Sequence, residues 1–282
     1  MPPPTTTTAF IDESIHADLG FIASALVFDN GRLTALVADA LQSVAMEPGR
    51  EEFKSGVRMD GNPKFQALRY RLLSAMGLDV RIAVVFTPSV NRSILGRDLL
   101  EYLTLICRRN GIEPALLQAY FDEGLFPSVE QAKMCAAAMP NLQNAELNFE
   151  QDSKRILGIQ VADAVAHTLG QVLKHDLLGN PKKILLGETE GYTNGTPADL
   201  GWTLLMSLRY ALFHRLVVYQ SNRDSIDPPA EPKIISQNED SATYQQHPEL
   251  FGWGIFAAPG LSEKLRGIIE DRFAKIWLGC IH

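Results

Sequence analysis

Short apolar runs bounded by Gly, Pro, Asp or Asn recur through the first half of the chain and predict β-strands. Their length and their enrichment in Phe, Ile and Val are typical of buried strands. We predict strands at Ala9 to Glu13, Phe21 to Phe28, Val80 to Thr87, Leu116 to Asp122 and Ala145 to Phe149.

Between these runs, apolar residues recur at the i, i+3, i+4 spacing of amphipathic helices. The expected helices are Arg32 to Ala45, Lys64 to Met76, Leu95 to Asn110, Ser128 to Met139 and Leu157 to Leu173. The third has the clearest end, because Gly111 can adopt the left-handed conformation of a C-cap. Two adjacent strands followed by strands that alternate with helices predict an α/β fold, a mixed sheet flanked by helices.

After His175 this alternation is lost, and Gly-rich and Pro-bearing stretches separate two apolar segments. Leu200 to Val218 and Leu261 to Leu278 have helical spacing, whereas Gln220 to Gln246 is polar. We therefore expect an α/β domain over residues 9–175 and a mostly helical extension over residues 176–282 that packs on it.

The composition is that of a globular protein, with 46% hydrophobic and 21% charged residues. A net charge of -7 argues against a protein that coats nucleic acid by electrostatics. It does not exclude a nuclease, because bound cations neutralise an acidic metal centre. Three cysteines at unrelated spacings and the lack of an apolar stretch of about 18 residues predict a cytoplasmic protein that does not enter the membrane.

Several carboxylates stand where a buried strand or helix is expected. Asp12 and Glu13 lie in the first strand, Asp122 ends a later strand, and Asp163 lies three residues after Gln160 on an apolar helix. An ionised carboxylate is costly to bury unless it is paired or binds a cation, so these residues suggest a divalent metal site. Each also has a local interpretation: a capping Asp, an Asp-Glu-Gly turn, or an exposed helix face.

The period of two along a strand sends neighbouring side chains to opposite faces, so Asp12 is a better ligand candidate than Glu13. Carboxylate oxygens suit Mg²⁺ or Mn²⁺, and the chain has no His or Cys pair with zinc-ligand spacing. His16 is expected to be a surface residue. His167, one helical turn after Asp163, could support a ligand.

The order of the motifs resembles a family of domains of unknown function from bacteria and phages, the DUF three-thousand-eight-hundred family. The resemblance covers residues 9–172 and rests on an N-terminal Asp-Glu-Ser motif, a C-terminal Gln-x-x-Asp motif, and the segments Glu52 to Ser55, Phe121 to Glu123 and Asp152 to Lys154. Ile15 stands where the family usually has Gly after Asp-Glu-Ser.

This resemblance implies a ribonuclease H-like fold and a nuclease or phosphodiesterase that uses Mg²⁺ or Mn²⁺ on a nucleic acid or nucleotide. It assigns catalysis and metal binding to Asp12, Asp122 and Asp163, with Glu13, Glu52 and Asp152 as supplementary ligands. Lys54 would contact a substrate phosphate, and Gln160 and His167 would orient ligands. One alternative is a module that keeps the acidic cleft and binds a nucleotide, nucleic acid or protein partner without turnover. Another is a structural or regulatory subunit whose helical C-terminal region drives assembly, with acidic residues that are only solvated. A homo-oligomer is compatible with each of these functions.

Overall fold

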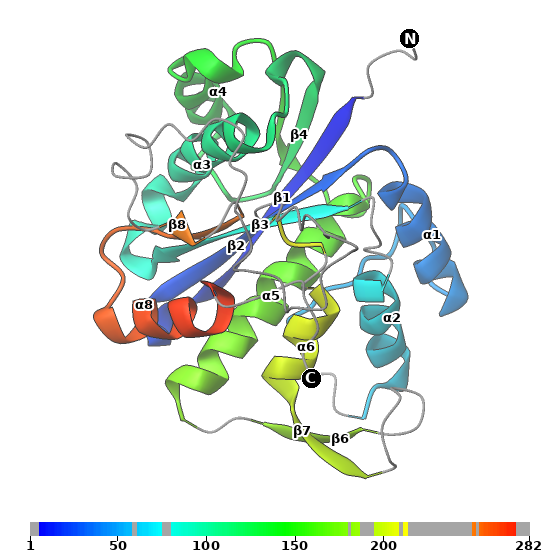
Figure 1. Cartoon of the computed structure of the whole chain (residues 1–282). Helices are drawn as coiled ribbons and strands as arrows, with labels where there is room; N and C mark the ends of the chain where they lie inside the picture. The colour runs from blue at the N-terminus through cyan, green and yellow to red at the C-terminus, as the bar shows by residue number, and fades with distance from the viewer. Residues whose placement is uncertain are drawn as a thin grey trace, which may run out of the picture.

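A mixed sheet of seven strands runs through the described part of the protein in this computed structural model (Figure 1). The structure describes residues 6–57, 61–74, 80–179, 182–186, 195–208, 211–213, 250–251 and 254–274. The strands of this sheet, in their spatial order, are β5 (Glu146–Gln151), β4 (Leu117–Asp122), β1 (Thr7–His16), β2 (Phe21–Asp29), β3 (Arg81–Pro88), β9 (Ile255–Ala257) and β8 (Leu250–Phe251).

The directions of the strands follow from their connections. The short helix η1 (Ala17–Leu19) joins β1 to β2, and these strands pair antiparallel, as do β2 and β3. A helical crossover separates β3 from β4, and β4 then pairs parallel with β1 and β5 parallel with β4. The carboxyl ends of β1, β4 and β5 therefore lie at one edge of the sheet.

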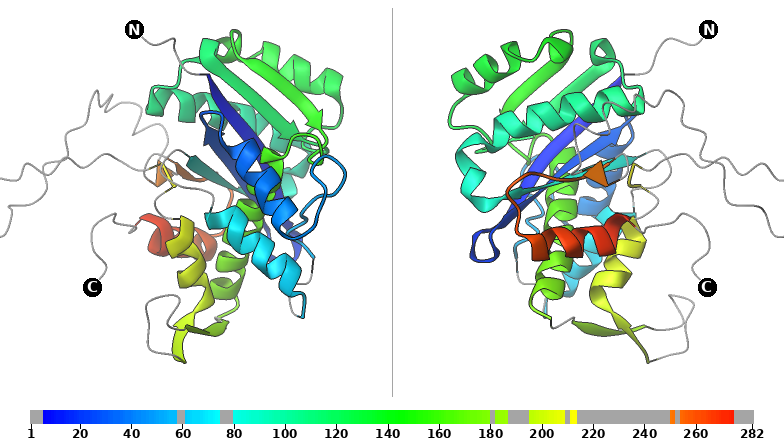
Figure 2. Two further views of the ribbon diagram at one scale, coloured as in Figure 1. Left: turned by 90° about the vertical axis from the view of Figure 1, so that its right-hand side faces the viewer. Right: turned by 60° about the vertical axis from the view of Figure 1, so that its left-hand side comes forward.

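Helices cover both faces of this sheet (Figure 2). They are α1 (Leu33–Ser43), α2 (Pro63–Ser74), α3 (Leu95–Asn110), α4 (Val129–Ala137), α5 (Gly158–Leu177), α6 (Leu200–Leu208) and α8 (Glu263–Ile269). Short helical turns η2 (Ser89–Ile94), η3 (Pro114–Leu116), η4 (Pro140–Leu142) and η6 (Glu270–Ala274) complete the helical elements described. The predicted α/β class, a mixed sheet flanked by helices, is confirmed.

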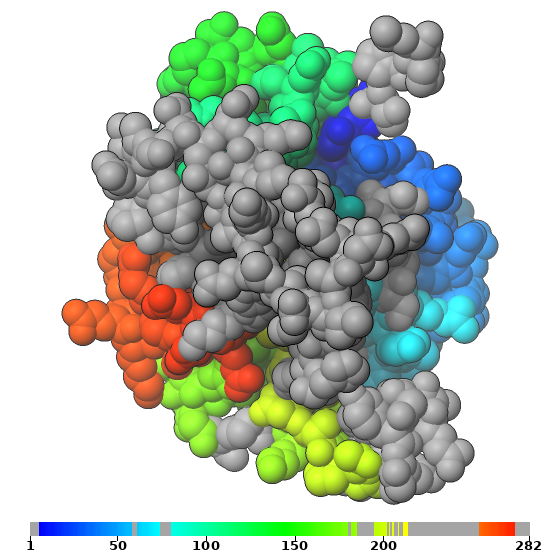
Figure 3. All heavy atoms as spheres, in the orientation of Figure 1, coloured from blue at the N-terminus to red at the C-terminus, as the bar shows by residue number. Residues whose placement is uncertain are grey.

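The period of two along β1 divides the core into two layers. Ala9 and Ile11 pack with α3 and α4 on one face. Phe10 packs with α1, α2, α5, α6 and α8 on the other. In Figure 3, α3 and α4 lie at the top of the visible face, α1 at the right and α8 at the lower left.

Helix α5 lies close against β1 because two of its residues have no side chain. A Cβ atom at Gly158 would overlap the ring of Phe10, and one at Gly170 would overlap the imidazole of His16. Helix α5 can therefore lie close to β1 from Phe10 to His16, the stretch that contains Asp12.

The C-terminal region contains strands that its apolar pattern did not predict. β6 (Lys183–Leu186) and β7 (Thr196–Asp199) form a separate hairpin, and β9 joins the main sheet parallel to β3. The helix predicted over 200–218 begins as α6 but is wrong at residues 211–213, because Leu212 instead forms a β-bridge with Ile82 of β3. The helix predicted over 261–278 is formed by α8 and η6 as far as Ala274. The remaining residues of both predictions and the polar stretch 220–246 lie outside the described residues. In the described part, no helix has both the length and the hydropathy needed to span a membrane.

Candidate active site

The strand carboxylates Asp12 and Asp122 are neighbours on one face of the sheet. Ile11 pairs with Phe121 in the parallel ladder between β1 and β4, so the residues that follow them lie side by side. The rings of Phe10 and Tyr120, two residues before each carboxylate, stack with centroids 5.7 Å apart, which shows that both strands direct these alternate side chains to the α5 side.

The third carboxylate, Asp163, comes from α5 and shares the electrostatic environment of the first two. Asp12 is only 6% exposed, and its pKa is raised well above the ordinary value by burial and then by the charges of Asp122, Glu13 and Asp163. The pKa of Asp122 is raised to about 6, chiefly by burial and to a smaller extent by the charges of Glu13 and Asp163, against the opposing effects of the Glu123 backbone N–H and of Lys54. Like charges close to one another in a low-dielectric site account for this coupling.

The donor chemistry of these residues fits a hard divalent cation, because all the available ligand atoms are carboxylate oxygens. Among the described residues, however, no group of three or more His, Cys, Asp or Glu side chains could hold a metal ion as it stands. Two of the carboxylates already accept hydrogen bonds: Asp12 accepts from the backbone N–H of Glu13 at 2.6 Å, and both oxygens of Asp163 accept from Ser55.

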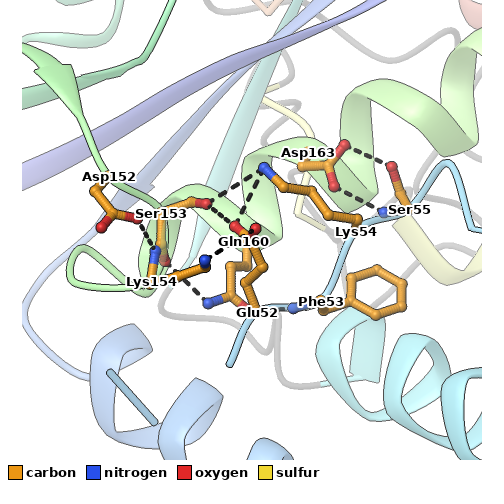
Figure 4. Close-up of polar contacts among 9 residues, drawn as sticks. All are labelled: Glu52, Phe53, Lys54, Ser55, Asp152, Ser153, Lys154, Gln160 and Asp163. Carbon is orange, nitrogen blue, oxygen red and sulfur yellow. Dashed lines mark hydrogen bonds and ion pairs between the residues drawn. The ribbon is translucent and has the colours of Figure 1, made fainter. Parts of the chain in front are cut away.

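A short segment crosses over the N-terminal part of α5 next to this site, and we call residues Glu52 to Ser55 the strap (Figure 4). Gln160, which is 1% exposed, accepts from the backbone N–H of Phe53 at 2.8 Å and donates to the carbonyl of Ser153 at 2.9 Å. Ser55 donates its backbone N–H to Asp163 at 2.8 Å and its hydroxyl at 2.5 Å. The Gln-x-x-Asp motif therefore fixes the strap on α5.

Glu52 and Lys54 form an ion pair on the strap. The Lys54 ammonium lies 3.2 Å from the Glu52 carboxylate, which also accepts from the Ser153 hydroxyl at 2.5 Å. Burial alone would lower the pKa of Lys54, but Glu52, Asp122 and Asp163 together raise it. Lys54 is therefore charged at neutral pH and partly balances the negative charge of the site.

Glu13 and Asp152 have partners of their own. Glu13 lies 2.7 Å from the Arg92 guanidinium in an ion pair, and burial raises its pKa although Arg92 opposes the shift. Asp152 accepts from the backbone N–H of Lys154 at 2.9 Å and lies 3.9 Å from the guanidinium of Arg155. The first of these contacts is that of an Asx turn, in which an Asp side chain accepts from the backbone N–H two residues on.

The surface position expected for His16 is wrong. Its ring is 6% exposed and stacks on Phe21 with centroids 4.7 Å apart, because Gly170 leaves room for it beneath α5. Burial and the neighbouring His167 lower the pKa of His16 to about 4. The pKa of His167 is also lowered by burial, although Asp163 opposes the shift.

Ser55, Ser153 and Arg92 contact the predicted site residues but were not singled out in the sequence. Ser55 lies inside the Glu52 to Ser55 segment that carries the resemblance, so its place near the site could have been predicted from the sequence. Ser153 also lies within such a segment, whereas Arg92 lies in η2, outside every motif, and its contact with Glu13 depends on tertiary structure.

No protein-family model matches this chain, and no curated protein matches it. Among solved structures it is similar to a chain of the PCNA and RNase HII complex from Archaeoglobus fulgidus, with 14% identity, 62% of this chain and 80% of that chain covered, and a TM-score of 0.38. It is also similar to ribonuclease H2 from Pyrococcus horikoshii OT3, with 11% identity, 62% and 89% covered, and a TM-score of 0.35. Both TM-scores are below 0.5, so these two likenesses add no argument about fold family or activity, and the ribonuclease H-like fold stays a prediction.

The raised pKa of Asp122 predicts a dependence of stability on pH in the metal-free protein. As pH rises from about 4 to about 6, the unfolded chain ionises before the folded one, so the folded state loses stability. Asp122→Asn removes this loss, so the variant is expected to be more stable than the wild type at pH 7. The expected difference in the free energy of unfolding is about 1–2 kcal/mol, less than the full pKa shift would give, because water screens part of the effect.

Urea unfolding in the presence of EDTA at pH 4 and pH 7 measures this difference. Asp39→Asn, on the exposed face of α1, is the matched control and should change stability little at either pH. Equal stability of Asp122→Asn and the wild type at pH 7 would contradict a raised pKa at this position.

Proposed function

We propose that this protein is a nuclease or related phosphodiesterase that depends on Mg²⁺ or Mn²⁺ and belongs to the family with the Asp-Glu-Ser and Gln-x-x-Asp motifs. One observation supports this most: Asp12, Asp122 and Asp163 come from three different elements and interact electrostatically. Burial and the charges of neighbouring carboxylates raise the pKa of Asp12 and of Asp122. A divalent cation would relieve this repulsion, which in the metal-free chain has only partial compensation from Lys54.

In this proposal Asp12, Asp122 and Asp163 hold the cation, with Glu13, Glu52 and Asp152 as supplementary ligands. The cation, when bound, supplies an activated water and a positive charge near the leaving oxygen of a phosphodiester. Residues of the chain would position the substrate and the metal ligands. The main substrate would be a nucleic acid in the cytoplasm.

Lys54 has a defined part in this proposal. Its ammonium carries a positive charge beside Asp122 and Asp163 and is only half-buried, so it can meet a phosphate oxygen at the rim of the site. Gln160 would hold the strap that carries Lys54, and Ser55 would orient Asp163. His167, neutral at neutral pH, would support Asp163 from the next turn of α5.

A second candidate is a binding module that keeps the acidic cleft without turnover. The observation that favours it is that Ser55 donates to both oxygens of Asp163, while no described group of ligands could hold a metal as it stands. In this case a nucleotide, nucleic acid or protein partner would bind without being cleaved.

Cleavage assays on single-stranded and double-stranded DNA, RNA and hybrid duplexes, with Mn²⁺ and with EDTA, distinguish these functions. We expect cleavage that needs Mn²⁺ and disappears in EDTA. Stoichiometric binding of Mn²⁺ without cleavage of any of these substrates would favour the binding module. A chain that binds no Mn²⁺ in calorimetry would contradict both the enzyme and its metal site.

A further inference from the structure

The backbone N–H and the carbonyl of Gly124, two residues after Asp122, are both hydrogen-bonded to side chains from other elements. Its backbone N–H donates to the Glu150 carboxylate of β5 at 3.0 Å. Its carbonyl accepts from the Arg92 guanidinium of η2 at 2.9 Å. Gly124 has a φ of 83°, which only Gly adopts readily, so the turn after Asp122 is fixed in an unusual conformation.

Arg92 also reaches the neighbour of the other strand carboxylate. The same guanidinium lies 2.7 Å from the carboxylate of Glu13, which follows Asp12. The planar guanidinium presents its donors in a rigid fork, so it can fix two acceptors relative to each other in a way that the flexible ammonium of a lysine cannot. One side chain thus links Glu13, which follows Asp12 in β1, with the turn that follows Asp122 of β4.

The backbone of β5 is distorted at the point where Glu150 contacts this turn. Tyr120 pairs with Asn148 but Asp122 pairs with Gln151, so β5 contains one extra residue. Glu150 has a φ of 54°, a left-handed conformation that is uncommon for residues other than Gly. Such strain persists where surrounding structure requires it, and bulges beside functional sites commonly redirect a side chain. Here the redirected group is the carboxylate that binds the N–H of Gly124.

We propose that Arg92 and Glu150 are positioning residues that fix Asp12 and Asp122 relative to each other and thereby select the cation that the site binds. This inference rests on the proposed function. Mg²⁺ demands a near-ideal octahedral arrangement of ligands, whereas Ca²⁺ accepts six to eight ligands in flexible geometry. A rigid spacing of the two strand carboxylates therefore favours Mg²⁺. Loosening this spacing should lower the affinity for Mg²⁺ more than the affinity for Ca²⁺.

Calorimetric titration with Mg²⁺ and with Ca²⁺ tests this, using the wild type, Arg92→Gln and Glu150→Gly. We expect both variants to lose about 10–100-fold in Mg²⁺ affinity, the range for groups that orient metal ligands, and to lose less for Ca²⁺. Glu150→Gly separates positioning from stability, because Gly relieves the left-handed strain. Its melting temperature should stay equal to that of the wild type or rise while its Mg²⁺ affinity falls.

Arg97→Gln is the matched control, because it removes the same charge from α3, where Arg97 pairs only with nearby Asp98 and Glu101 in the contacts that the structure records. If Glu150→Gly and Arg92→Gln keep the wild-type Mg²⁺ affinity and the wild-type ratio of Mg²⁺ to Ca²⁺ affinity, the positioning role is overturned and the proposed function stands. If the wild type binds Mn²⁺ but neither of these ions, the positioning role is overturned and the proposed function stands, whereas a wild type that binds none of the three ions contradicts both.

Discussion

Asp12→Asn is expected to lower the affinity for Mn²⁺ by more than about 100-fold and to abolish metal-dependent cleavage. The loss should exceed that of residues that only orient ligands, because Asp12 is the most buried carboxylate of the site and would contact the cation itself. Calorimetric titration with Mn²⁺ measures the first effect, and cleavage of nucleic acid with Mn²⁺ measures the second.

Unfolding is not expected to explain this loss. The Asn side chain keeps the oxygen that accepts from the N–H of Glu13, and it removes a buried charge whose ionisation is unfavourable in the metal-free chain. Asp18→Asn, at the exposed turn between β1 and β2, is the control and should bind Mn²⁺ as the wild type does. Unchanged Mn²⁺ binding in Asp12→Asn would remove Asp12 from the site.

Gln160→Leu is expected to destabilise the fold by about 2–5 kcal/mol and to weaken Mn²⁺ binding as well. The substitution leaves the buried N–H of Phe53 and the carbonyl of Ser153 without their partner, and each unpaired buried group costs about 1–3 kcal/mol. The strap would lose its attachment to α5, and Ser55 would no longer be held against Asp163. Urea unfolding followed by circular dichroism measures the change in free energy.

Gln131→Leu provides the comparison, since Gln131 lies on an exposed part of α4 and its replacement should change stability by no more than about 0.5 kcal/mol. A cost for Gln160→Leu within this same range would show that the strap is held by other contacts. The Mn²⁺ affinity of Gln160→Leu should therefore be measured at a temperature where the variant stays folded. Any loss of affinity then reports the detachment of the strap from α5 and not unfolding.

The elements of the α/β part were predictable because each has a strong local pattern. The helix predicted from Leu95 to Asn110 has these limits in α3, where Gly111 adopts the left-handed C-cap. Strands β8 and β9 were missed for a physical reason: two or three residues are too few to show a period. They are strands only because β3 offers β9 a partner, and that information is not local to the sequence.

The placement of Asp12, Asp122 and Asp163 in one site came from the family resemblance, with support from the apolar surroundings of each carboxylate. Their hydrogen bonds could not be predicted in the same way. The N–H of Phe53 and its acceptor on Gln160 are 107 residues apart in the chain, and a backbone N–H has no signature in the sequence. The burial of His16 likewise depends on the space that Gly170 leaves on another element.

Strand β9 has a consequence for how this protein folds during synthesis. β3 is buried after its first residue, and its pairing with residues 255–257 can form only after those residues have been translated. Until then this edge of β3 has an incomplete set of backbone partners, and such edges pair readily with other chains. The sheet is therefore completed on this side only after a long intervening segment has been synthesised, and during that interval the edge of β3 is a site where other chains could pair.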